Sequence, residues 1–217
     1  MKKILVLVGL VSVLPTMALA HHPLGGMSME TFAQGILSGI GHPILGFDHL
    51  FFVALVGIAA LYTGRALLAP FAYVAAMLVG CLMMSFSFGL PIKEIVVGLS
   101  LLTLGYIVLS GRALSLGLAV VIFSGFGLFH GSAFGDSIVG QESALTSQVL
   151  IGYLIGLGVI QYGISVGAGW VALHVWKATE STTIQARLSG AVVAGIGLFL
   201  CMENAEDFVF QMMDWST

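Results

Sequence analysis

The chain has 217 residues, of which 59% are hydrophobic and 8% are charged, and its formal net charge is −3. Because about a quarter of the residues in soluble domains are charged, this composition excludes an ordinary soluble domain and predicts an all-α, polytopic membrane helix bundle. The negative balance favours cations over nucleic acid as partners.

The first twenty residues have the layout of a secretory signal peptide. Two lysines precede the apolar run from Ile4 to Leu14, and Ala18-Leu19-Ala20 forms a small-residue cleavage site. Cleavage there makes His21 and His22 the mature N-terminus, where the α-amine and an imidazole can chelate one metal ion together. A chance polar start explains these histidines equally well. We predict residues 21–217 to form a single transmembrane domain.

Six membrane spans are predicted after the leader, because about 20 apolar residues are needed to cross a bilayer. Residues 27–40 are moderately apolar and read as an outer or re-entrant helix that leads into the first span. The predicted spans are Ile44 to Tyr62, Ala66 to Leu90, Ile95 to Ser110, Ala113 to His130, Val149 to Trp170 and Leu188 to Met202.

An ionisable cluster opens the first span. His42 and His49 stand seven residues apart, so on one continuous helix they share a face, and Asp48 lies about 100° round it. Pro43 and Gly46 predict that the helix begins or bends here. Two imidazoles and a carboxylate suit Ni²⁺, Co²⁺, Zn²⁺ or Cu²⁺, and ionisable groups at membrane depth usually face a cavity or partner. The alternative is a set of interfacial polar residues at a helix cap.

This cluster resembles the signature of the HupE/UreJ family of membrane metal permeases, which reads His-Pro, two residues, Gly, one residue, Asp-His. Five residues match it position by position: His42, Pro43, Gly46, Asp48 and His49. The resemblance implies uptake of nickel or cobalt. The residues alone imply a site for a divalent transition metal in a membrane.

The fourth predicted span ends in a third candidate ligand, His130. The family's second signature, His-Gly, one residue, Ala, is similar to His130, Gly131 and Ala133. The alternative for His130 is a lone interfacial histidine. In the fifth span, Gln161 occupies a position where the family commonly has histidine, and an amide is a weaker transition-metal ligand than imidazole. Gln161 is therefore either a pathway residue or a hydrogen bond between helices.

The basic residues predict the orientation. With the mature N-terminus outside, Lys93 alone falls on the outer side and four basic residues fall in the cytoplasm: Arg65, Arg112, Lys177 and Arg187. Both termini then lie outside a bacterial inner membrane, and His130 reaches the depth of the first cluster. The outer segments carry Asp136 and Glu142, which we take as secondary pathway residues.

The prediction is a secondary permease for Ni²⁺ or Co²⁺, with Zn²⁺ or Cu²⁺ less favoured as cargo. His42, Asp48, His49 and His130 form its outer site. The chain has no P-loop, no His-Glu-x-x-His and no Gly-x-Ser-x-Gly, so we expect neither an enzyme nor a catalytic cofactor. A membrane metalloenzyme and a metal-delivery assembly factor remain as alternatives. Besides the metal ion, the expected partners are the lipid bilayer and a second copy of the chain, because Gly35/Gly39, Gly152/Gly156 and Gly163/Gly167 have close-packing spacing.

Overall fold

The computed structural model describes residues 29–139 and 146–213. These residues form seven α-helices: α2 Phe32–Leu45, α3 Phe47–Leu61, α4 Ala69–Ser85, α5 Lys93–Leu109, α6 Leu116–Val139, α7 Ser147–His174 and α8 Ile184–Met212. The all-α prediction is confirmed. The predicted signal peptide, His21, His22 and Glu142 lie outside the described residues.

Three of the described helices are long and apolar enough to cross a membrane, namely α6 over Leu116–Asp136, α7 and α8. The pair α2 and α3 passes the same test together, bent by 83°, which raises the number of candidate spans to four. Helix α4 is apolar but has only 17 residues, and α5 has 17 as well. Helices suited to a membrane are therefore present, while the count of six spans stays a prediction.

The first span is broken where the sequence predicted a bend. Thr31 caps α2 through a capping box with Gln34, and Pro43 lies in the last turn of this helix. Gly46 has extended dihedral angles, φ −83° and ψ 92°, and separates α2 from α3. An extended residue interrupts the helical hydrogen-bond ladder, so the chain turns by 83° at this point.

The helix ends differ from the predicted boundaries at α6 and α8. Helix α6 continues past His130 to Val139, because Gly131 and Gly135 let its backbone lie directly against Met77 and Met84 of α4. Helix α8 runs from Ile184 to Met212 rather than from Leu188 to Met202. Polar residues at these ends were read as span limits, although such residues continue a helix when its backbone bonds remain satisfied.

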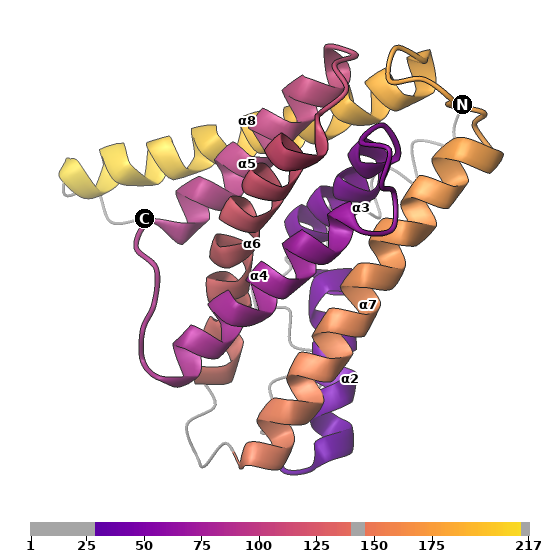
Figure 1. The fold of residues 1–217 in the computed structure, drawn as a ribbon. Helices are drawn as coiled ribbons and strands as arrows, with labels where there is room; N and C mark the ends of the chain where they lie inside the picture. Colours follow the sequence, from indigo (N-terminus) through magenta and orange to yellow (C-terminus); the bar gives the residue numbers. More distant parts are fainter. Residues whose placement is uncertain (1–28, 140–145, 214–217) are drawn as a thin grey trace, which may run out of the picture.

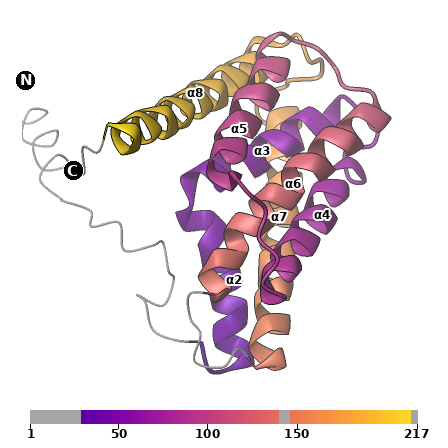
Figure 2. The same cartoon turned by 90° about the vertical axis from the view of Figure 1, so that its left-hand side faces the viewer.

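The helices pack as neighbouring pairs, as Figure 1 shows: α2 lies along α7, α4 along α6, and α5 along α8. The C-terminal end of α8 projects beyond the other helices, which is clearest in Figure 2. At α2 and α7 the contact is reciprocal. A Cβ on Gly39 would meet the Tyr153 backbone, and one on Gly156 would meet the Ile36 backbone. The predicted close packing at these glycines is confirmed within the chain.

Hydrogen bonds gather one set of helix ends together. The Tyr62 hydroxyl after α3 donates to the Ala178 carbonyl at 3.0 Å. Ser181 Oγ donates to the Gly111 carbonyl, and Arg187 Nε donates to the Leu109 carbonyl. The ends of α3, α5 and α7 and the start of α8 therefore form one end of the molecule.

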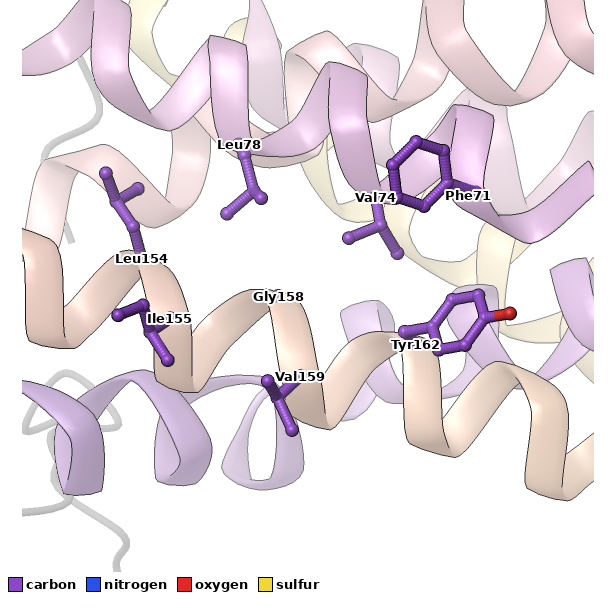
Figure 3. Close-up of a pocket in the computed structure, with 8 residues that line it drawn as sticks. All are labelled: Phe71, Val74, Leu78, Leu154, Ile155, Gly158, Val159 and Tyr162. Atoms are coloured by element: carbon purple, nitrogen blue, oxygen red, sulfur yellow. The ribbon is translucent and has the colours of Figure 1, made fainter. Parts of the chain in front are cut away.

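An apolar groove of about 610 Å³ lies between α4 and α7. Figure 3 shows its lining, which comes from Phe71, Val74 and Leu78 on α4 and from Leu154, Ile155, Gly158, Val159 and Tyr162 on α7. The polar atom of this lining, the Tyr162 hydroxyl, donates to the Leu67 carbonyl at 3.0 Å. The groove therefore presents no ligand set for a metal ion.

Candidate metal site

Two histidines meet in the interior of the bundle. His49, in the first turn of α3, places its Nδ1 at 2.7 Å from Nδ1 of His130 on α6. His130 is fully buried, and His49 is 7% exposed. The two residues are 81 positions apart in the sequence. The fold brings them into contact, as the sequence analysis expected for His130 and the first cluster.

A serine determines which nitrogen of His130 carries the proton. Ser100 Oγ on α5 donates to the Val97 carbonyl at 2.7 Å and lies 2.8 Å from His130 Nε2. Because the hydroxyl proton is already used, His130 Nε2–H donates to Ser100 and the lone pair of His130 is on Nδ1. That lone pair points at His49. A neutral imidazole nitrogen in this state is what a metal ion requires.

His42 is held beside the pair by a tyrosine. Its Nδ1 lies 2.9 Å from the Tyr153 hydroxyl, which itself donates to the Phe134 carbonyl at 3.2 Å. His42 Nδ1–H is therefore the donor to Tyr153, which leaves the lone pair on Nε2. The ring centroids of His42 and His49 are 6.4 Å apart.

The reason predicted for this proximity was wrong. The two histidines do not share one helix face, because Gly46 places His42 on α2 and His49 on α3. The 83° bend between these helices brings the rings toward one another instead.

Aromatic side chains enclose the histidine pair. Phe52 stacks on His130 with centroids 4.4 Å apart, and Phe134 packs on His49 at 4.2 Å. The edge of Tyr73 meets the His130 ring at 5.9 Å. These rings exclude water from the two imidazoles, and electrostatic interactions there are therefore stronger than in water.

Asp48 connects the pair to an acidic cavity. Its Oδ2 lies 3.7 Å from His49 Nε2, and the carboxylate also lines a cavity of about 230 Å³. Residues from α3, α5 and α8 line this cavity: Asp48, Glu94, Val97, Leu200, Glu203, Asn204 and Asp207. The acidic lining makes the electrostatic potential in this cavity favourable to cations.

The four predicted ligands are thus neighbours rather than one assembled coordination shell. Within residues 29–139 and 146–213, no three His, Cys, Asp or Glu side chains stand close enough together to hold a metal ion. The structure joins His49 and His130 directly, and places His42 and Asp48 on either side of His49.

The secondary candidates lie in other places. Gln161 is fully buried on α7, and its Oε1 accepts from the Tyr73 hydroxyl at 2.8 Å. Asp136, at the end of α6, forms an ion pair with Lys93 at the start of α5. His174 lies exposed at the end of α7, where its ring stacks on Trp170 with centroids 5.0 Å apart.

Three residues that shape the site were missed in the sequence: Ser100, Tyr153 and Tyr73. Each stands in an apolar helix without a neighbouring motif, and its partner is 30 to 111 residues away. Spacing along the chain reports contacts within one helix, so it gives no signal for these partners.

Comparison with known proteins identifies related chains. Residues 9–200 match the family model described as HupE / UreJ protein. "Protein HupE" of Rhizobium leguminosarum bv. viciae is 28% identical over 189 residues, which cover 86% of this chain and 91% of that protein. No solved structure matches the chain.

Proposed function

The chain belongs to the HupE/UreJ family, and on that premise we propose that it carries Ni²⁺ or Co²⁺ inward across the bacterial inner membrane as a secondary permease. The observation that carries the proposal is the buried contact of His49 with His130, in which the Nδ1 atoms lie 2.7 Å apart. Imidazole suits divalent nickel and related ions.

The ion replaces the proton that the two histidines share. Nitrogens that bind one metal ion at bond lengths of about 2.0–2.1 Å lie roughly 3 Å from each other, so a small separation of the two rings suffices. The Nδ1 proton of His49 leaves on binding, and Asp48 beside Nε2 stabilises a proton on that other nitrogen. Binding therefore weakens at acid pH, because protons compete for the same lone pairs.

His42 and Asp48 complete the ligand set in this proposal. A turn of either side chain toward His49 adds Nε2 of His42 or a carboxylate oxygen to the two Nδ1 atoms. Tyr153 supports binding by His42 because it fixes the His42 tautomer. Hydrogen bonds to ligating histidines raise the basicity of the ring and fix its orientation. A transition ion needs several such donors in fixed geometry.

The membrane potential is sufficient to drive the ion inward. It supplies about 2.3 kcal/mol per charge per 100 mV, and so about twice that for a dication. The sequence has no P-loop of its own, which agrees with a permease that uses the potential directly.

The test is uptake of radiolabelled Ni²⁺ and Co²⁺ into proteoliposomes under an imposed potential. His49→Ala and His130→Ala should each abolish uptake, and the double variant should be no worse than either alone, because residues that act as a unit are non-additive. His174→Ala is the matched control, since it removes an exposed histidine at the far end of α7 and should leave uptake unchanged.

Binding is followed separately by the absorption spectrum of Co²⁺ on the purified protein. The imidazole signal should diminish in stages as His42, His49 and His130 are replaced. A signal that survives all three replacements moves the site elsewhere. Metal binding without flux favours the metalloenzyme or the delivery factor instead.

A further inference from the structure

Two buried polar groups on α7 are unsatisfied in their hydrogen bonding. Gln161 Nε2 and Ser165 Oγ both have no hydrogen-bond partner among the described residues. Each side chain is fully buried. They stand four residues apart on one helix, so they face the same side, with roughly 5–6 Å between their Cβ atoms.

An apolar environment makes this arrangement costly. A buried donor or acceptor without a partner costs about 1–3 kcal/mol, and native proteins usually satisfy such groups with protein or ordered water. Water suits this place because one molecule both donates and accepts, and buried water typically bonds to several polar groups. Gln161 Nε2 requires an acceptor, whereas the Ser165 hydroxyl takes either role.

Tyr73 connects Gln161, the first of these two residues, to the histidine pair. Its hydroxyl donates to Gln161 Oε1 at 2.8 Å, and its ring meets His130 edge-on with centroids 5.9 Å apart. Phe52 packs against both rings, at 4.4 Å from His130 and 5.5 Å from Tyr73.

The two polar groups therefore lie farther along α7, toward its C-terminus, than the point where α7 contacts the histidine site. Gln161 follows Tyr153, the partner of His42, by about 12 Å along α7, and Ser165 by about 18 Å.

We propose a second binding site on the transport pathway, formed by Tyr73, Gln161 and Ser165. This site holds water and receives the cation after the cation leaves the histidines. Gln161 Nε2 is a donor, so it binds the water and not the cation. The ligands of the cation are oxygen atoms, those of the water, Gln161 Oε1, the Tyr73 hydroxyl and the Ser165 hydroxyl. Oxygen donors of this kind hold Ni²⁺ or Co²⁺ less firmly than imidazole does. Conduction requires a site of this weaker kind, because an ion must leave as readily as it enters.

This inference rests on the proposed function, and its test separates the two. Gln161→Leu and Ser165→Ala should keep the Co²⁺ imidazole signal and the half-saturating concentration, but lower the maximal uptake rate by about tenfold or more. Gln161→His should restore part of the lost flux, because it returns a polar group. Ser189→Ala on α8, whose hydroxyl already donates to the Ala186 carbonyl, is the control.

Water is detected directly by radiolytic hydroxyl-radical footprinting of the purified protein. After each oxidation rate is divided by the intrinsic reactivity of its side chain, Tyr73 should be oxidised more than Phe123, although both are fully buried, and the two substitutions should reduce that oxidation. Tyr73 oxidation no greater than that of Phe123 would overturn the proposal of a hydrated second binding site. Wild-type uptake in both variants, or loss of the Co²⁺ signal in them, would also overturn it. Absence of uptake by the unaltered protein refutes the proposed function instead.

Discussion

The proton on His130 is fixed by one hydroxyl group. Ser100 accepts a hydrogen bond from His130 Nε2, so the lone pair of His130 faces His49 rather than α5. Tyr153 performs the same task for His42. In the proposed site, the tautomers of the histidines therefore depend on uncharged groups that are not proposed ligands.

Ser100→Ala tests this dependence. The substitution leaves His130 Nε2–H buried without its acceptor, so the other tautomer gains population and the lone pair turns away from His49. Loss of such a supporting group lowers metal affinity by about 10- to 100-fold. Co²⁺ titration of the purified protein measures the change, and Ser189→Ala is the control. Unaltered affinity would show that Ser100 serves only packing.

The cluster of ionisable residues could be identified from the sequence at this scale, but the groups that hold it in place could not. His42, Asp48, His49 and His130 stand out because ionisable residues are rare in apolar helices. Ser100, Tyr73 and Tyr153 are ordinary residues of such helices until the fold brings a distant partner to them. The unsatisfied atoms Gln161 Nε2 and Ser165 Oγ could not be found from the sequence either, because their burial depends on how the helices pack.

Close packing of α2 on α7 positions His42 over Tyr153. Gly35 and Gly39 face the backbone of α7, and Gly152 and Gly156 face the backbone of α2. Glycine spacing predicted close packing at these positions, but not that α2 and α7 would be each other's partners. The same spacing at Gly163 and Gly167 has a different meaning, because a Cβ at either position meets nothing within 4 Å.

Gly156→Ala should therefore separate α2 from α7. The new methyl would overlap the Ile36 backbone, and overpacking of this kind costs about 1–3 kcal/mol. Gly163→Ala on the same helix is the matched control, for which helix propensity alone favours alanine by up to about 1 kcal/mol. Thermal unfolding in detergent should show a lower Tm for the first variant and an equal or higher Tm for the second. Equal stability of the two would contradict the packing argument.

The span boundaries show where sequence reasoning ends at the scale of helices. Apolar runs located every helix approximately, because burial and lipid both require apolar side chains. The extension of α6 to Val139 could not be read from them, since it depends on glycines that match the surface of α4. The break at Gly46 was predicted from local residue types, but its angle is set by packing.

The two ends of the molecule separate the residues that the charges predict to lie on opposite sides of the membrane, and the orientation itself stays a prediction. Tyr62, Gly111 and Arg187 lie at the end where α7 meets α8, which is the predicted cytoplasmic side. Glu94, Glu203 and Asp207 of the acidic cavity belong to segments that are predicted to lie outside, as do Lys93 and Asp136 of the ion pair. Asp48 stands in the outer part of the first predicted span. A membrane that separates the two ends would expose the acidic face to incoming cations.

Labelling of single cysteines tests this orientation in intact spheroplasts. With Cys81 and Cys201 replaced, Asp207→Cys on α8 should react with a membrane-impermeant maleimide. Thr179→Cys, equally exposed in the α7–α8 connection, should react only after the membrane is opened. The reverse labelling pattern would invert the protein in the membrane and place the histidine pair on the cytoplasmic side.

The acidic cavity should govern how efficiently the protein captures its ion, rather than how fast the ion crosses. Glu203 and Asp207 line the cavity on α8, and their charge acts on an approaching ion over a distance that salt screens. Glu203→Gln with Asp207→Asn should raise the half-saturating Ni²⁺ concentration several-fold at low ionic strength and leave the maximal rate unchanged. The difference should shrink as salt is added. Glu180→Gln removes an exposed acid at the opposite end of the molecule and should change neither parameter. If half-saturation in the double variant equals that of the unaltered protein at low salt, the cavity is not the route by which the ion reaches Asp48 and His49.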